Sequence, residues 1–179
     1  MNGDTVKYGL LAEFETPAET LRAAALVRDA GYKRWDVFTP FAVHGMDQAM
    51  GLRNSPVGWF TFIAGATGFT CGMLMIWFMN AKNYPIAVGG KPLFSPIFSF
   101  PVAYELTILL GAFGSLLGML FLNRLPRLYN PLFRSVRFTR VTHDRFFIVI
   151  EATDPKFSDV ETRRLLEQAG SRHVEEVRD

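Results

Sequence analysis

The pattern of hydrophobic and polar residues divides the chain into a long apolar centre between two ends of mixed polarity. Val57 to Met79 is a run of 23 residues without charge or proline. As a helix it would be about 34 Å long, enough to cross a hydrocarbon core of about 30 Å. A second uncharged run covers Leu106 to Asn123, and Pro101 to Tyr104 extend it. We therefore expect two membrane spans at about 57–79 and 102–123, joined by an irregular loop over 80–101.

The part before the spans has the pattern of a strand, a helix and a second strand. Val6 to Phe14 is mostly apolar and favours a buried strand. Thr16, Pro17 and Glu19 follow it in the order of a helix N-cap, a first-turn proline and the acid of a capping box. A helix is therefore expected after Thr16, and the alternation in Lys33 to Thr39 predicts the second strand.

The part after the spans repeats this order. Arg145 to Ala152 is rich in aromatic and β-branched residues, which favours a strand. Ser158 and Glu161 have the spacing of a second capping box, so a helix should follow, and Arg172 to Val177 should form the last strand. The two βαβ halves predict an α+β protein whose soluble domain is ferredoxin-like, with a split βαβ arrangement of two helices on a four-stranded antiparallel sheet.

This fold class implies a domain that the membrane hairpin interrupts. Residues 1–53 would form the first half of the cytoplasmic domain with a connector, 54–124 the transmembrane hairpin, and 125–179 a basic connector with the second half. The segment 41–53 mixes apolar and polar residues and could lie in the membrane interface. The segment 124–138 is expected to be extended and bound to lipid headgroups, with a further strand at 137–141.

Positive charge predicts the orientation of the hairpin. The loop between the spans contains only Lys82 and Lys91, whereas arginines lie beside the other ends of the spans. Positively charged segments stay in the cytoplasm, so both termini are expected there and the loop in the periplasm. The arginines that carry this prediction are Arg53, Arg124, Arg127, Arg134 and Arg137.

Composition narrows the possible chemistry. The net charge is +2 and the basic residues cluster beside the spans, which indicates contact with the lipid bilayer and not with nucleic acid. Cys71 is the only cysteine and lies within a span, so the chain cannot build a zinc or iron–sulfur cluster or a CxxCH haem attachment. No phosphate-binding loop, zinc-protease or hydrolase motif occurs. We expect no enzyme, no catalytic residue, and neither a cofactor nor a metal bound by this chain.

Small residues recur at helical spacing in both spans and predict close helix packing. They are Ala64, Gly68 and Gly72 in the first span and Gly111, Gly114, Ser115 and Gly118 in the second. Two interpretations stay open: the spans pack on each other, or they dock on helices of a larger membrane partner.

Three polar residues are candidates for a proton path or a polar interface. Glu105 is the only acidic residue close to a span, and a carboxylate within a membrane is costly. Here it is expected about one turn inside the outer boundary, where water and headgroups reach it. His44 and Asp47 are three residues apart and could share a helix face, although ordinary hydrogen bonding in a loop explains them as well.

Three stretches together resemble one protein family. They are YGLLAEFETPAETLRAA (Tyr8 to Ala24), PFAVHGMDQAMGL (Pro40 to Leu52) and a third that begins LPRLYNPLF and ends RFFIVIEATDPKF (Leu125 to Phe157). With the hairpin between them, they resemble the ActD-type subunit of alternative complex III, a family long catalogued as a domain of unknown function.

The resemblance implies a place in a bacterial respiratory or photosynthetic membrane complex that oxidises quinol and passes the electrons outward. In such complexes a multihaem cytochrome c subunit and an iron–sulfur subunit hold haem c and iron–sulfur clusters, and NrfD-like integral-membrane subunits bind quinol. The ActD-type subunit has two spans, a cytoplasmic domain and no cofactor.

We therefore expect a non-catalytic subunit of the bacterial cytoplasmic (inner) membrane, packed against NrfD-like subunits and capping their cytoplasmic face. The alternatives are a regulatory or proton-path-gating module of the same complex, or a free-standing, membrane-anchored ligand sensor.

Overall fold

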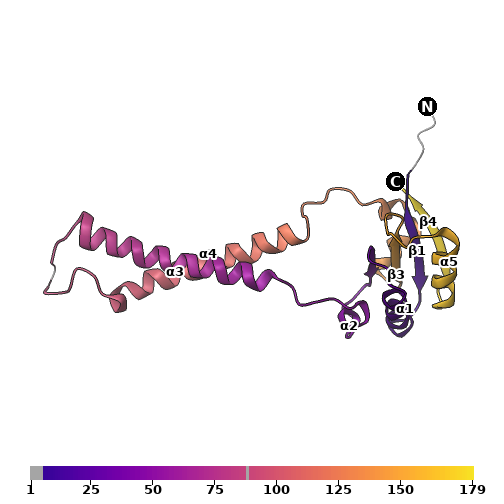
Figure 1. The fold of residues 1–179 in the computed structure, drawn as a ribbon, viewed down its shortest axis with the longest axis horizontal. Coiled ribbons are helices and arrows are strands. Elements are labelled where there is room, and N and C mark those ends of the chain that lie inside the picture. The colour runs from indigo at the N-terminus through magenta and orange to yellow at the C-terminus, as the bar shows by residue number, and fades with distance from the viewer. Residues whose placement is uncertain (1–5, 88) are drawn as a thin grey trace, which may run out of the picture. The chain divides into compact units, whose positions relative to one another are not determined.

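The computed structural model describes residues 6–87 and 89–179 and divides into two compact units (Figure 1). One unit combines the residues through Arg53 with Tyr129–Asp179, and the other is Asn54–Leu128. The first unit holds a four-stranded antiparallel sheet, and the second holds two long apolar helices, so the protein is of the mixed α+β class. Residue 88, in the expected loop, lies outside the described residues.

The sheet has the strand order β2-β3-β1-β4, and its neighbouring strands are antiparallel. The strands are β1 (Lys7–Phe14), β2 (Trp35–Phe38), β3 (Phe146–Glu151) and β4 (His173–Arg178). The central pair joins the two ends of the chain, with Phe14 opposite Phe146. β1 and β3 approach closely at Gly9, where an added Cβ would lie 2.2 Å from the carbonyl oxygen of Ile150, so only glycine fits there.

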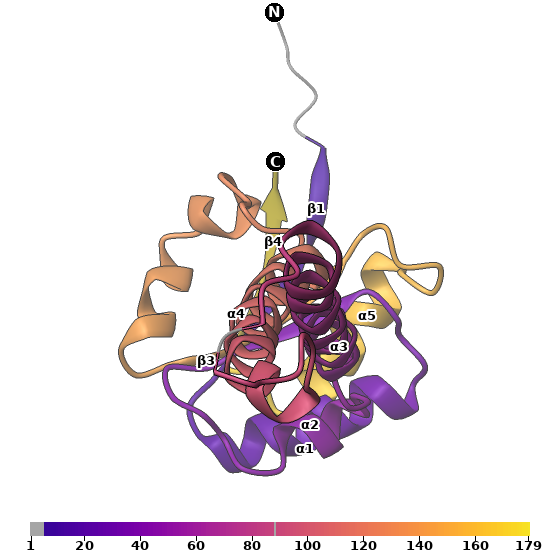
Figure 2. The same ribbon diagram turned by 90° about the vertical axis from the view of Figure 1, so that its left-hand side faces the viewer.

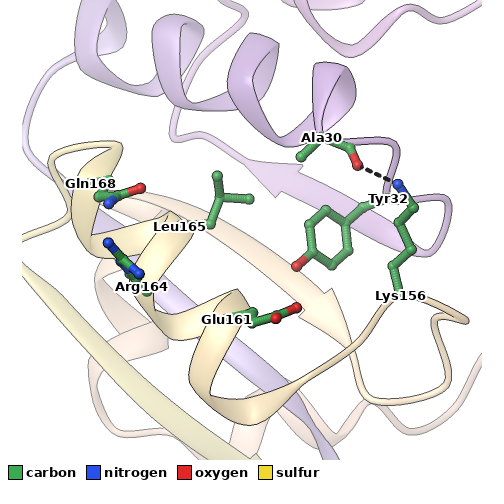
Figure 3. A pocket seen from close by; sticks show the side chains of 7 residues that line it. All are labelled: Ala30, Tyr32, Lys156, Glu161, Arg164, Leu165 and Gln168. Atoms are coloured by element: carbon green, nitrogen blue, oxygen red, sulfur yellow. Dashed lines mark hydrogen bonds between the residues drawn. The ribbon is translucent and has the colours of Figure 1, made fainter.

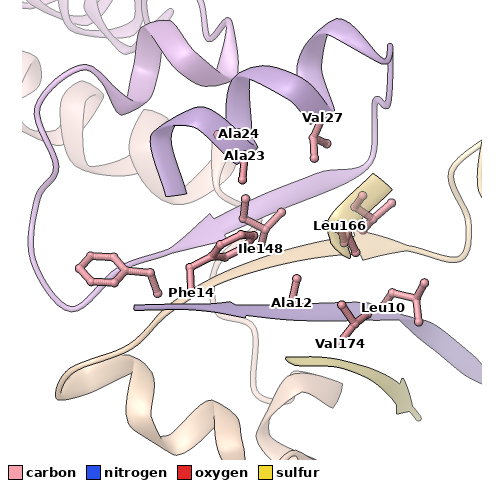
Figure 4. Close-up of a cluster of buried hydrophobic side chains, with 11 residues drawn as sticks. Leu10, Ala12, Phe14, Ala23, Ala24, Val27, Ile148, Leu166 and Val174 are labelled. Atoms are coloured by element: carbon pink, nitrogen blue, oxygen red, sulfur yellow. The ribbon is translucent and has the colours of Figure 1, made fainter. Parts of the chain in front are cut away.

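Two helices cover one face of the sheet. They are α1 (Pro17–Asp29) and α5 (Asp159–Gln168), and Figure 4 shows side chains from both gathered over the strands. The core that they form with alternate strand residues contains Leu10, Ala12, Phe14, Ala23, Ala24, Val27, Phe146, Ile148, Ile150, Leu166 and Val174. This alternation follows from the two-residue period of a strand, which directs every second side chain to the same face.

The two helices begin differently. At α1 the predicted capping box is confirmed: Thr16 accepts a hydrogen bond from the backbone of Glu19, and the Glu19 carboxylate accepts one from the backbone of Thr16. At α5 the predicted capping box is wrong, because the Ser158 side chain makes no capping bond. The buried Thr162 hydroxyl instead accepts a hydrogen bond from the Ser158 backbone N–H at 3.2 Å.

The other face of the sheet is covered by the segment that follows the hairpin. This segment forms two 3₁₀ helices, η2 (Pro131–Arg134) and η3 (Arg137–Thr142), so the extended connector expected over 124–138 is wrong from residue 131 on, and the expected strand at 137–141 is wrong. Leu132 and Phe138 are buried against this face. The physical reason lies in β3, which is apolar on both faces and therefore needs a cover on each.

The short helix α2 (Met46–Met50) belongs to the domain. Glycines with positive φ flank it at Gly45 and Gly51, and Met46, Ala49 and Met50 pack against the core beneath α1. These apolar side chains are therefore turned toward the core of the domain.

The second unit is an antiparallel pair of long helices, seen side by side in Figures 1 and 2. α3 (Val57–Phe78) continues into a π-helical turn, η1 (Met79–Asn83), and α4 (Pro96–Leu122) returns beside it. α4 begins earlier than the expected boundary at 102, so the connection is shorter than 80–101. Pro101 does not end this helix, because near the N-terminus it removes only one backbone hydrogen bond and membrane helices tolerate proline.

Candidate functional site

The glycines of the apolar hairpin lie where its two helices come closest. A Cβ added at Gly68 would stand 2.3 Å from the carbonyl oxygen of Leu106, and one added at Gly72 would stand 2.7 Å from the Cα of Ala103. Both distances are below any real Cβ contact, and both neighbours are backbone atoms. Glycine at these two positions therefore sets the separation of α3 and α4.

The same arrangement continues toward the other end of the hairpin. An added Cβ at Gly114 would meet the Cβ of Ala64 at 2.5 Å, and one at Gly118 would meet the Cβ of Phe60 at 2.8 Å. Gly111 is looser, since its nearest neighbour, the Cα of Gly65, would be 3.9 Å away.

A polar contact lies in the same interface. The hydroxyls of Ser115 and Thr61 are 2.7 Å apart and share a hydrogen bond between the helices, while Ser115 also donates to the carbonyl of Gly111. Thr61 and Ala103 were not among the expected interface residues. The sequence contained a pattern that could have identified them. Thr61 lies four residues before Gly65, and Ala103 lies eight residues, or two four-residue steps, before Gly111.

The small residues thus lie between the two helices of the hairpin. The surface that the hairpin turns outward consists mainly of large apolar side chains, among them Phe62, Ile63, Phe69, Leu74, Phe113, Leu117 and Phe121. Such a surface is stable only under lipid or against other apolar helices, because in water it would form an exposed apolar patch far larger than soluble proteins carry.

Glu105 lies on this outward surface. Its neighbours Ala103 and Leu106 contact α3, whereas the Glu105 side chain is exposed. Because α4 begins at Pro96, nine residues of the helix precede Glu105.

His44 and Asp47 are both exposed on the soluble unit. Among the described residues, no hydrogen bond joins these two side chains. Asp47 instead serves through its backbone, whose carbonyl accepts a hydrogen bond from Leu52 N–H at 2.8 Å. The structure therefore does not assemble His44 and Asp47 into a site with each other, and it places Glu105 in a different unit from both.

The five arginines expected to determine topology have different surroundings. Arg53, Arg124 and Arg127 are exposed, and Arg134 lies over the ring of Tyr129 at 5.8 Å. Arg137 donates a hydrogen bond of 3.0 Å to the carboxylate of Glu13. Arg137 therefore also has a structural part in the domain.

This contact belongs to a charged cluster at the end of the sheet that sequence reasoning missed. Glu13 is 5% exposed and also lies 3.4 Å from Nε of Arg145. Arg145 in turn binds Glu15 at 2.7 Å, and Arg172 binds Glu15 at 2.8 Å. The hydrogen bond from Arg145 lowers the pKa of Glu15. The partners are far apart in sequence, so no local pattern could have revealed the cluster.

Asp154 organises the turn after β3. Its buried carboxylate accepts hydrogen bonds from the backbone N–H groups of Lys33 and Arg34, each at 2.6 Å, and of Lys156 at 2.8 Å. Burial acts to raise the pKa of Asp154, but these hydrogen bonds outweigh it and hold the pKa below its ordinary value. Asp154 thus links β2 to the second half of the domain in a structural role.

An open groove of about 610 Å³ lies between the residues that follow α1 and the length of α5 (Figure 3). It is lined by Ala30, Tyr32, Lys156, Glu161, Arg164, Leu165 and Gln168. Lys156 donates to the carbonyl of Ala30 at 2.9 Å, and the Tyr32 hydroxyl is 3.0 Å from that of Thr162.

Across residues 6–87 and 89–179, no group of three or more histidine, cysteine or acidic side chains is placed to hold a metal ion. The features that stand out are the tightly packed hairpin and its apolar outer surface. They define a class of protein: a small α+β domain that carries two helices long and apolar enough to cross a membrane.

Comparison with protein families makes the assignment specific. The model of the ActD subunit of alternative complex III matches residues 8–176, and the chain belongs to this family. A comparison with curated proteins gave no match. The resemblance drawn from the sequence is therefore confirmed, and other subunits of alternative complex III are implied as partners.

Proposed function

We propose that this chain is a non-catalytic subunit of a quinol-oxidising complex, in which the hairpin packs against NrfD-like quinol-binding subunits and the domain caps their cytoplasmic face. The multihaem cytochrome c and iron–sulfur subunits of the same complex would hold the haem c and iron–sulfur clusters. This chain contributes membrane anchoring and interface area.

The observation that carries this proposal is the packing of the hairpin. Its small residues pack between α3 and α4, so the two helices form one unit by themselves. The outer surface of this unit is apolar along both helices. A membrane complex covers such a surface with lipid and with the helices of its larger subunits. Membership of the ActD family indicates which complex this is, alternative complex III.

The proposal includes the fold and the orientation of the domain. The strand order β2-β3-β1-β4, with α1 and α5 on one face, supports a ferredoxin-like arrangement of two βαβ halves. Arg53 and Arg124 flank the hairpin at the ends opposite to its loop, which supports cytoplasmic termini in a bacterial inner membrane.

Native separation of a gentle detergent extract tests this function directly. The band that contains this chain is stained for haem and its subunits are identified by mass spectrometry. Co-migration with haem-bearing and NrfD-like subunits is expected. Migration of the chain alone, without haem, would contradict the proposal and favour a free-standing membrane sensor.

The second candidate is a proton-path-gating module, and the position of Glu105 within the hairpin is the observation in its favour. It predicts that Glu105→Gln lowers quinol turnover or proton stoichiometry in a complex that still contains this chain. Unchanged quinol turnover and proton stoichiometry would contradict the gating role and leave the structural role as the remaining candidate.

A further inference from the structure

We propose that Glu105 marks the face of α4 that docks on a transmembrane helix of a partner subunit, and that this helix presents an arginine or lysine at the depth of Glu105. The inference rests on the proposed function, because it takes α3 and α4 to span the membrane within a complex. Beyond the proposed function, it specifies which face of α4 contacts the partner and which side chain the partner presents there.

The packing of the hairpin fixes the depth of Glu105. The contacts of Gly72 with Ala103 and of Gly68 with Leu106 bracket it, so Glu105 lies level with about Thr70 of α3. From that level α3 continues for eight residues to Phe78, which is about 12 Å of helix. On α4 the nine residues from Pro96 to Tyr104 cover about 13 Å.

Both helices are uncharged above this level. On the arm of the hairpin that contains α3, no charged residue lies between Thr70 and Lys82. On the arm that contains α4, none lies between Lys91 and Glu105. A glutamate has only two methylene groups and cannot reach across two turns of helix, unlike a long lysine or arginine side chain that extends to the interface. With α3 and α4 spanning the membrane as proposed, the charge-free stretches on both helices would place the Glu105 carboxylate within the apolar layer.

The direction of the side chain excludes α3 as its partner. α4 turns Ala103, Gly111 and Gly118 toward α3, and these three residues are buried. At 100° per residue Glu105 lies almost opposite that face, and it is exposed. The described residues of the hairpin thus offer no cation to this carboxylate.

Lipid alone is an unfavourable environment for this face. A carboxylate facing hydrocarbon is costly, and ionisable residues inside membranes are found paired or facing the interior of a bundle. Glu105 also shares one face of α4 with residues spaced three and four apart along the helix, a face that one neighbouring helix can cover. The exposed stripe consists of Val102, Glu105, Leu109, Ala112, Leu116 and Met119.

A cationic partner satisfies these observations together. An arginine or lysine from a neighbouring helix would neutralise Glu105, and the apolar members of the stripe would pack on the same helix. A single polar position in such a seam specifies the partner and the register, as buried polar residues do in coiled coils.

Glu105→Leu tests the proposal in cells that make the complete complex. Leucine is favourable in hydrocarbon, so this change does not impair insertion of the hairpin. It leaves the partner's cation unpaired, which should lower the amount of this chain per haem in the purified complex about tenfold or more after a salt and detergent wash. Glu167→Gln, at an exposed carboxylate of α5, is the matched control and should retain the wild-type amount.

The outcomes separate the two levels of the argument. If wild-type chain does not co-purify with haem, the proposed function fails and this inference fails with it. If wild-type chain co-purifies and Glu105→Leu is retained equally well, only the inference is overturned. Retention with lost proton stoichiometry would likewise overturn it, since that result assigns Glu105 to a proton path.

Photo-crosslinking provides a second test with Glu105 in place. A photoreactive residue at Leu109, within the stripe, should crosslink to another subunit, while the same residue at Leu117, outside the stripe, should give at least about tenfold less product. Both leucines are exposed, at 50% and 60%. A Leu109 probe that gives no product with another subunit would overturn the docking face.

Discussion

Replacing Gly68 by alanine should separate the two helices of the hairpin. The new Cβ would stand 2.3 Å from the carbonyl oxygen of Leu106, whereas an ordinary contact needs at least 3.4 Å. α4 would therefore have to retreat by about 1 Å, and a gap of that size loses a quarter to a half of the dispersion energy of the contacts it opens.

The magnitude follows from two opposing effects. Overpacking of this kind costs about 1–3 kcal/mol, while exchanging glycine for alanine in a helix returns about 1 kcal/mol. We expect Gly68→Ala to destabilise the packed hairpin by up to about 2 kcal/mol. Gly111→Ala is the matched control: its Cβ would have 3.9 Å of space, so it should be neutral or stabilising by up to about 1 kcal/mol.

A cysteine pair measures the packing in the full chain. Thr61→Cys and Ser115→Cys, in a Cys71→Ser background, place two thiols where hydroxyls now lie 2.7 Å apart. The fraction that forms a disulfide is followed in mixed micelles as the proportion of SDS rises. Gly68→Ala should shift the midpoint to less SDS and Gly111→Ala should not. Equal midpoints for the two variants would refute the steric argument.

Three further predictions concern the domain and are measured by thermal unfolding of the full chain in detergent. Thr16→Ala should cost about 1 kcal/mol because it removes a capping bond, whereas Ser158→Ala should cost almost nothing because that side chain makes none; equal losses would contradict the assignment of the caps. Phe138→Ala should cost about 3–5 kcal/mol, since the ring is 4% exposed on the second face of the sheet, and a loss below about 1 kcal/mol would mean that η3 does not cover it. Asp154 has a lowered pKa, so its contribution is complete above the ordinary value of 3.8 and is lost as the pH falls through the lower folded value. Asp154→Asn should remove that acid-dependent part of the stability profile, and an unchanged profile would contradict it.

Local patterns in the sequence were sufficient for most elements of the fold. Thr16, Pro17 and Glu19 form a capping box because all its interactions lie within four residues. The first long helix follows from the absence of charge over a length that few soluble helices reach. Strand β3 follows from its dense β-branched and aromatic composition.

The errors arose where tertiary contacts decide the outcome. Leu132 and Phe138 lie among prolines and arginines, so the segment looked like an extended basic connector. Only the uncovered apolar face of β3 explains why it folds back as 3₁₀ helices. Met46 and Met50 similarly pack on the core beneath α1, which a local amphipathic pattern cannot distinguish from a membrane surface.

The small residues of the hairpin stand out in the sequence by their spacing. Spacing alone identified Gly68, Gly72, Gly114 and Gly118, but the direction in which they face needed the packing of the hairpin. The cluster around Glu13 joins residues from opposite ends of the chain and carries no sequence pattern of its own.

The pairing of β1 with β3 has a consequence for biosynthesis. Phe14 and Phe146 stand opposite each other in the sheet, although the whole hairpin is synthesised between them. If the hairpin spans the membrane as proposed, the first half of the domain stays incomplete, with its apolar strand uncovered, until both helices have entered the bilayer and the second half has been made. A chain in which one helix failed to insert would then have its halves on opposite sides of the membrane and could not close the sheet. Closure of the sheet would thus depend on correct insertion of the hairpin.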